Sequence, residues 1–188
     1  MVSKGLIFFV IVATLSFNLR VDADPSVPKS PFSIALDTLQ DQLNYTFQNV
    51  GLLRRAMTHS SYSEENNKAM SILGEGVIET SVSMQMLVKN IDISSKDLNQ
   101  DISEVSKVET SCAVDGKSLG LQNIVRVSSK TNSTTPSVVC GAFRALFGAV
   151  ALDTGSADSA GKLFLKVHFE DAGKGRIGHV RNTLTMMS

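Results

Sequence analysis

The feature that most constrains the fold is the long apolar stretch at residues 138–152. Small residues interrupt it repeatedly, at Gly141, Ala142, Ala145, Gly148 and Ala149. A stretch of this composition predicts a helix that is buried rather than exposed on one side. Small side chains on a buried helix allow its neighbours to approach closely. We therefore expect a buried helix here with closely packed neighbours.

Apolar residues recur at helical spacing along the rest of the chain. Phe32, Leu36, Leu39 and Leu43 are spaced by four, three and four residues, which predicts one helical face. Asn49 is a plausible N-cap for a second helix, and residues 74–89 are apolar enough for a central helix. Further helices are expected from residue 102 to a break at Gly116 and over 156–169. A brief extended piece is expected at residues 124–127. With 188 residues, 43% of them hydrophobic, the chain is expected to form a single all-α domain.

The N-terminus has the pattern of a secretory signal. Lys4 precedes an apolar run at residues 6–17, and small residues around Ala23 predict cleavage before Asp24. The run is roughly a dozen residues long, shorter than the ~20 that a membrane span needs. The alternatives are a buried N-terminal helix or an uncleaved anchor. We expect a signal peptide at 1–23, a lead-in at 24–31, the domain at 32–169 and a flexible tail at 170–188. The mature chain would have no membrane span and would enter the endoplasmic reticulum lumen or be secreted.

A secretory destination gives two other features a meaning. Asn132 and Asn44 each begin an N-glycosylation triplet, and Asn132 is the better candidate because its Ser/Thr-rich surroundings resemble an exposed loop. Cys112 and Cys140 could pair in an oxidising compartment, or remain two buried free thiols.

Several segments resemble the ribonuclease III endonuclease domain, in the same order and at similar spacing. They are residues 43–62, 66–78, 108–121 and 141–150. The string Ser71-Ile72-Leu73-Gly74-Glu75 occupies the place of the family signature, Glu-x-x-Glu-Phe-Leu-Gly-Asp, and the last segment is similar to the family's Asp-x-x-Glu-Ala helix. The resemblance implies a helical bundle of the ribonuclease III type.

The resemblance also implies which residues would bind metal. The family cleaves double-stranded RNA with two Mg²⁺ ions held by carboxylates on these two helices. The four matching positions here are Ser71, Glu75, Gly141 and Arg144, and Lys68 replaces a further signature glutamate. Of these, Glu75 alone is a carboxylate, and the positive charge of Arg144 opposes a dication. We therefore expect no retained metal cofactor and an inactive site, with Arg144 either paired with Glu75 or turned to solvent.

Other polar residues do not restore the site. Glu79, four residues after Glu75, could share its helix face, and Glu64 and Glu65 are near in sequence. His59 is expected to have a hydrogen-bonded structural role. His168 and His179 have no carboxylate or cysteine at ligand spacing in the sequence.

The charge balance bears on the partners. Lys+Arg and Asp+Glu both number 18, and this formal neutrality counts against strong unaided binding to nucleic acid. We therefore expect an interaction module that forms a homodimer or binds another protein through the signature region, where Ile72 replaces the family's interface aromatic. The alternative is a divergent ribonuclease or a protein that binds double-stranded RNA in RNA processing. Resemblance to a small plant member of the family implies a part in nuclear fusion (karyogamy).

Overall fold

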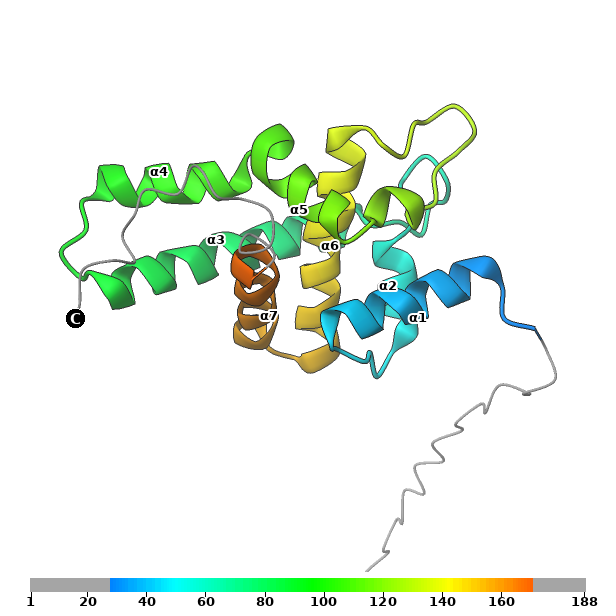
Figure 1. Ribbon diagram of the computed structural model, residues 1–188, viewed down its shortest axis with the longest axis horizontal. Coiled ribbons are helices and arrows are strands. Elements are labelled where there is room, and N and C mark those ends of the chain that lie inside the picture. The colour runs from blue at the N-terminus through cyan, green and yellow to red at the C-terminus, as the bar shows by residue number, and fades with distance from the viewer. Residues whose placement is uncertain (1–27, 171–188) are drawn as a thin grey trace, which may run out of the picture.

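The computed structural model describes residues 28–170. The predicted signal peptide, the first half of the lead-in (residues 24–27) and residues 171–188 of the predicted tail lie outside them. Within the described range the chain forms seven α-helices, a π-helical segment η1 and a 3₁₀ turn η2, shown in Figure 1. In chain order they are α1 (Pro31–Leu43), α2 (Val50–Ala56), α3 (Lys68–Lys89), α4 (Ser95–Ser106), η1 (Val108–Cys112), α5 (Ala113–Ser118), η2 (Leu121–Asn123), α6 (Pro136–Thr154) and α7 (Ala157–Glu170). The all-α fold predicted from the sequence is confirmed.

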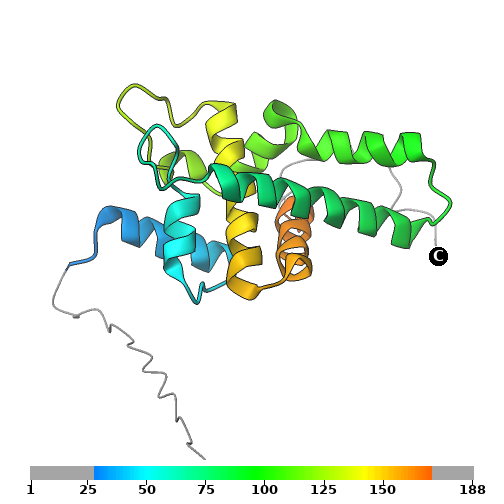
Figure 2. The same ribbon diagram turned by 180° about the vertical axis from the view of Figure 1, so that it is seen from behind.

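Helix α6 lies at the core of the domain, and its apolar composition predicted that it would be buried. It runs through the middle of the bundle in both Figure 1 and Figure 2, and α2, α3, α5 and α7 pack against it. Its Phe143 and Phe147 are fully buried and make edge-to-face contacts with Phe164 of α7. By length and apolar composition α6 could cross a membrane, but most of it is buried inside the domain. Its apolar character is therefore accounted for by the core.

Two glycines let α3 and α6 cross at very close range. A Cβ atom on Gly74 would overlap the backbone carbonyl oxygen of Arg144, and one on Gly148 would overlap the carbonyl oxygen of Met70. Neither clash could be relieved by rotating a side chain, because each involves backbone atoms. This crossing fixes how the two helices that carry the candidate site lie against each other.

Two glycines do not lie at helix ends, although the sequence predicted that they would. Gly74 was expected to begin a helix, but α3 begins six residues earlier, at Lys68. Gly116 was expected to break a helix, but it is buried inside α5, where a Cβ atom would lie 2.7 Å from Cγ1 of Val139. Both glycines are packing positions, not helix ends. The other local predictions fared better: Asn49 is the N-cap of α2, and Arg126 forms an isolated parallel bridge with Thr58 within the predicted extended piece.

The second half of α3 and the whole of α4 project from the bundle as a two-helix arm (Figures 1 and 2). Helix α4 contributes no fully buried residue. Val88, near the end of α3, is 85% exposed. Helix α3 is packed into the core as far as Val82, which is fully buried, and becomes exposed only in its last turns.

Asp153, in the last turn of α6, holds the connection between α1 and α2. Its carboxylate accepts hydrogen bonds from Tyr45 Oη at 2.7 Å and from the backbone N–H groups of Gln48 and Asn49 at 2.9 and 2.8 Å. Burial alone would raise the pKa of Asp153, but these three hydrogen bonds together lower it below its ordinary value. Burial, with the hydrogen bond to Asp153 and its charge, raises the pKa of Tyr45 well above the usual range, so Tyr45 remains a donor.

Replacing Asp153 with asparagine is expected to lower the free energy of unfolding by about 1–3 kcal/mol at pH 7. A carboxylate with a lowered pKa stabilises the fold above its unfolded pKa of about 4, and this contribution is lost as the pH falls through the folded-state pKa. Urea unfolding at pH 7 and pH 3 should therefore show a smaller difference between wild type and variant at pH 3. Asp158→Asn is the control, because its ion pair with Lys162 is solvent-exposed and contributes little. Equal losses at both pH values would contradict the assignment.

Candidate functional site

The four positions that correspond to the family's metal ligands lie on the two closely crossing helices. Ser71 and Glu75 are one turn apart on α3, and Gly141 and Arg144 are one turn apart on α6. Residues at these spacings share a helix face. Ser71 and Gly141 are both half-buried. The scaffold for a site between two helices is thus present, although its side chains have changed.

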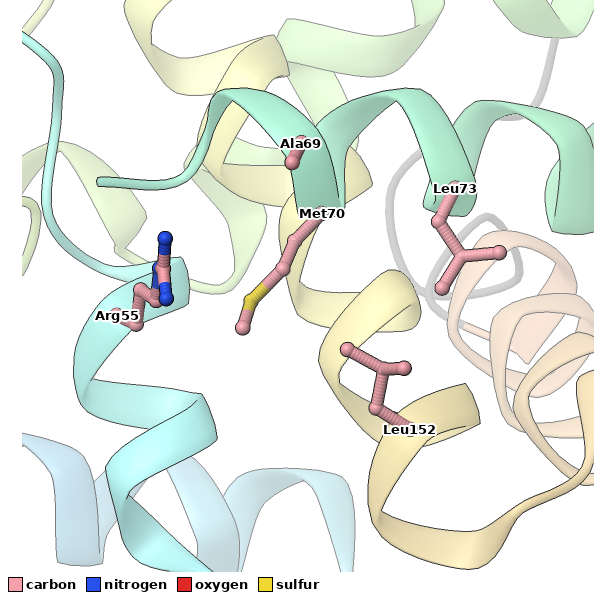
Figure 3. A pocket seen from close by; sticks show the side chains of 5 residues that line it. All are labelled: Arg55, Ala69, Met70, Leu73 and Leu152. Atoms are coloured by element: carbon pink, nitrogen blue, oxygen red, sulfur yellow. The ribbon is translucent and has the colours of Figure 1, made fainter. Parts of the chain in front are cut away.

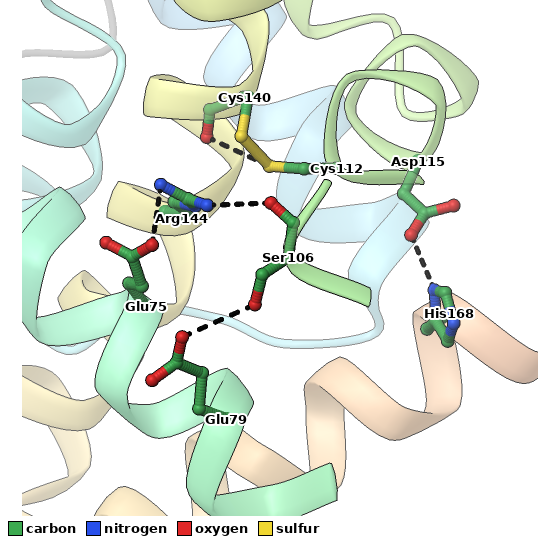
Figure 4. Close-up of a disulfide and its surroundings, with 8 residues drawn as sticks. All are labelled: Glu75, Glu79, Ser106, Cys112, Asp115, Cys140, Arg144 and His168. Carbon is green, nitrogen blue, oxygen red and sulfur yellow. Dashed lines mark hydrogen bonds and ion pairs between the residues drawn. A yellow bond between two sulfur atoms is a disulfide. The ribbon is translucent and has the colours of Figure 1, made fainter. Parts of the chain in front are cut away.

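Arg144 turns inward and pairs with Glu75. Its Nη1 lies 2.9 Å from Glu75 Oε1, and its Nη2 donates to the backbone carbonyl of Ser106 at 2.9 Å (Figure 4). The Arg144 side chain is only 17% exposed, compared with 39% for Glu75. Of the two orientations left open by the sequence, the inward ion pair is the one formed.

The neighbouring carboxylates do not complete a metal site. Glu79 accepts a long hydrogen bond of 3.4 Å from Ser106 Oγ, while Glu64, Glu65 and Lys68 are exposed. Within residues 28–170, no three His, Cys, Asp or Glu side chains gather closely enough to hold a metal ion. Mg²⁺ requires clustered anionic oxygens, and the four family positions supply one carboxylate beside a guanidinium. These residues do not fit the family's Mg²⁺ ions.

A disulfide lies beside the site. Cys112, at the end of η1, is bonded to Cys140 of α6, with the two Cα atoms 5.1 Å apart. Both residues are 2% exposed, and Cys140 immediately precedes Gly141. The bond therefore joins η1 to α6 next to the position of one lost carboxylate (Figure 4).

The histidines show what sequence spacing can miss. His168 Nδ1 lies 2.6 Å from Asp115 Oδ2, so His168 has a carboxylate partner in three dimensions although none lies at ligand spacing in the sequence. The two residues are 53 positions apart, and no local pattern signals the pair. The His168 ring also stacks on Phe164, and the pair joins α5 to α7. The other two histidines have separate outcomes. His59 has the expected hydrogen-bonded role, since its Nδ1 contacts Ser61 Oγ at 2.9 Å. His179 lies outside the described residues.

An apolar cavity opens on the face of the bundle formed by α2, α3 and α6. Its volume is about 320 Å³, and it is lined by Arg55, Ala69, Met70, Leu73 and Leu152 (Figure 3). Ile72 immediately precedes the lining residue Leu73 on α3 and is 73% exposed. An exposed apolar side chain next to an apolar hollow is typical of a contact surface.

The two glycosylation candidates lie on the surface. Asn132 is exposed in the loop between η2 and α6, and its Oδ1 accepts hydrogen bonds from Thr134 N and Oγ1 at 2.9 and 2.8 Å. Asn44 is exposed at the C-terminus of α1, in a left-handed conformation.

The fold is a helical bundle in which two closely crossing helices carry the candidate site. Residues 49–171 match the family described as Ribonuclease-III-like, and the chain belongs to that family. Among individual relatives, it is 54% identical to Protein NUCLEAR FUSION DEFECTIVE 2 of Arabidopsis thaliana over 162 residues, which cover 86% of this chain and 83% of that protein.

Bacterial enzymes are more distant. The chain is 33% identical to Ribonuclease 3 of Thiobacillus denitrificans over 121 residues, covering 62% of this chain and 53% of the enzyme. Among solved structures, the nuclease domain of ribonuclease III from Campylobacter jejuni superposes with a TM-score of 0.67 at 24% identity, covering 72% of this chain and 99% of that domain. That structure is described as flexible in a region involved in dimer formation. At this level of identity the likeness shows the shared fold.

Proposed function

We propose that this protein is a catalytically inactive member of the ribonuclease III family that acts as an interaction module. The observation that carries the proposal is the ion pair between Arg144 and Glu75 at 2.9 Å. It places a permanent positive charge against the one carboxylate retained at the four family positions. Cleavage in this family depends on metal ions that stabilise negative charge on the phosphate, and a buried guanidinium with one carboxylate opposes their binding.

Duplex RNA incubated with the purified protein and Mg²⁺ should remain intact. A bacterial ribonuclease III serves as the positive control, and Glu75→Gln as the matched variant. Specific cleavage that disappears in Glu75→Gln would contradict the proposal and support the alternative, a divergent ribonuclease. Binding without cleavage would support an RNA-binding protein instead.

The face of α3 around Ile72 is the proposed contact surface. Ile72 is exposed and immediately precedes Leu73, which lines the apolar cavity together with Leu152 of α6. In a two-fold symmetric dimer the same patch meets itself, so a projection beside a hollow on one subunit can fill the hollow of the other. The Campylobacter jejuni nuclease domain, which shares the fold, has a region involved in dimer formation. These observations favour a homodimer, or a heterodimer with a related domain.

Ile72→Asp is expected to convert the dimer to monomer, because it places a charge where an apolar contact is buried. Sedimentation velocity of the protein with its disulfide intact measures the change. The dimer affinity of the variant should be at least tenfold lower than that of the wild type. Val88→Asp is the control: Val88 lies on the same helix and is 85% exposed, but it is on the arm away from the cavity. A wild-type monomer with no protein partner, or equal effects of the two variants, would contradict this surface.

We also propose that the protein acts in the secretory pathway, in the endoplasmic reticulum lumen or after secretion. The buried Cys112–Cys140 disulfide supports this, because disulfides persist in oxidising compartments. The signal-like N-terminus and the exposed Asn132 triplet agree with it. A mobility shift on endoglycosidase treatment, abolished by Asn132→Gln with Asn44→Gln, is the expected result. An unmodified chain in the cytosol would contradict it.

The name of the Arabidopsis thaliana relative suggests a process, nuclear fusion. The nuclear envelope is continuous with the endoplasmic reticulum, so a lumenal protein can reach that setting. We propose a part in nuclear fusion for this chain on the basis of the 54% identity. A plant lacking the protein should show defective fusion of nuclei, and its rescue by Glu75→Gln would agree with a role that needs no catalysis.

A further inference from the structure

We infer that Arg144 is a fixed cation that joins three helices at the position where the family binds metal, and that the backbone scaffold for a divalent metal persists around it. The inference rests on the proposed loss of catalysis, but it concerns stability and metal affinity, which are measured without RNA.

The contacts of Arg144 resemble the coordination of a cation. A divalent metal at such a site neutralises carboxylates and accepts carbonyl oxygens as ligands. Arg144 neutralises Glu75 through Nη1 and donates from Nη2 to the carbonyl of Ser106, both at 2.9 Å. Ser106 is the last residue of α4, where carbonyls lack helical partners and a positive charge is favourable. One guanidinium thereby links α6, α3 and the end of α4.

The link extends over a segment that is also held covalently. The chain passes from Ser106 directly into η1, and η1 ends at Cys112, which is bonded to Cys140 of α6. The segment from Ser106 to Cys112 is thus held to α6 at its first residue by Arg144 and at its last residue by the disulfide. Neither tie needs a metal ion.

The backbone around Arg144 has not closed over the lost ligands. A Cβ atom on Gly141 would meet no heavy atom within 4 Å, so a side chain can begin there without a clash. Ser71 is half-buried on the face of α3 that carries Glu75. The helix crossing itself depends on Gly74 and Gly148, not on any of the four ligand positions. The absence of a metal site therefore resides in side chains rather than in the scaffold.

A double-mutant cycle tests the native pair. Arg144→Met and Glu75→Gln should each lower the thermal unfolding midpoint, and the double variant should lose clearly less than the sum of the two, because either change removes the same interaction. EDTA or 1 mM Mg²⁺ should leave the wild-type midpoint unchanged at matched ionic strength. Additive losses, or a metal-dependent wild-type midpoint, would overturn the inference.

Rebuilding the ligands tests the scaffold. A chain with Ser71→Glu, Gly141→Asp and Arg144→Glu, retaining Glu75, should gain about 5 °C or more in unfolding midpoint with 1 mM Mn²⁺ relative to EDTA. The matched amide chain, with Ser71→Gln, Gly141→Asn and Arg144→Gln, should show no such gain. A folded carboxylate chain without a gain would overturn the persistence of the scaffold. If that chain cannot fold even with Mn²⁺, the inference that the scaffold persists is also rejected. The double-mutant cycle tests the role of Arg144 independently of this result.

These outcomes are separable from those of the proposed function. RNA cleavage by the wild-type protein would refute catalytic inactivity whatever the cycle shows. Additive losses in the double-mutant cycle would refute the role of Arg144 as a joining cation. They would not contradict the proposed function, which is tested by whether RNA is cleaved.

Discussion

Gly74→Ala is expected to lower the free energy of unfolding by about 3 kcal/mol or more, a large part of the ~5–15 kcal/mol typical of a domain. The added methyl group would overlap the backbone carbonyl oxygen of Arg144. Because the obstacle is backbone in the central helix α6, the clash can be relieved only by moving α3 and α6 apart. That movement would open the most extensive packing between helices in the described part of the chain.

Gly76→Ala provides the control on the same helix. A Cβ atom at Gly76 meets no heavy atom within 4 Å, so the substitution should stabilise α3 by about 0.5–1 kcal/mol through helix propensity alone. Urea unfolding followed by circular dichroism compares the two variants directly. The two substitutions are expected to change the free energy of unfolding in opposite directions. Similar behaviour of the two variants would show that the α3–α6 crossing is looser than described.

Removal of the disulfide has the second large expected effect. Cys112→Ala with Cys140→Ala should lower the free energy of unfolding by about 3–4 kcal/mol, on the loop-entropy estimate for a bond that closes 28 residues. The cross-link restricts the unfolded chain, and in the folded chain it holds η1 against α6. The loss should be visible as a lower urea midpoint for the double alanine variant.

Reduction supplies the control for this prediction. Dithiothreitol should destabilise the wild-type protein by a similar amount and leave the double alanine variant unaffected, since it has no bond to reduce. Cys112 and Cys140 are buried, so reduction should proceed mainly through unfolding. A double variant as stable as the oxidised wild type would show that the bond does not contribute to stability.

Local patterns predicted much of the fold. The apolar period through Leu36, Leu39 and Leu43 marked the buried face of α1, and Asn49 marked the start of α2. The composition of residues 138–152 predicted the buried helix α6. These succeeded because helical periodicity and N-capping depend on residues within a few positions of one another.

The errors occurred where a residue has more than one structural use. Glycine can end a helix or permit close packing, and Gly74 and Gly116 have the second use here. Nothing within a few residues distinguishes the two, because the deciding atoms belong to α6. The pairing of His168 with Asp115 was missed for the same reason, since it joins two helices distant in sequence.

The same distinction between local and long-range information applies to the candidate site. The sequence by itself determined that Ser71 and Gly141 cannot supply anionic ligands and that Arg144 carries a positive charge, because these are properties of the side chains wherever they lie. The tertiary structure alone decided that Arg144 faces Glu75 and the end of α4, and that Cys112 meets Cys140. Ion pairs and disulfides depend on distances between segments, and those distances are set here by the close crossing of α3 and α6.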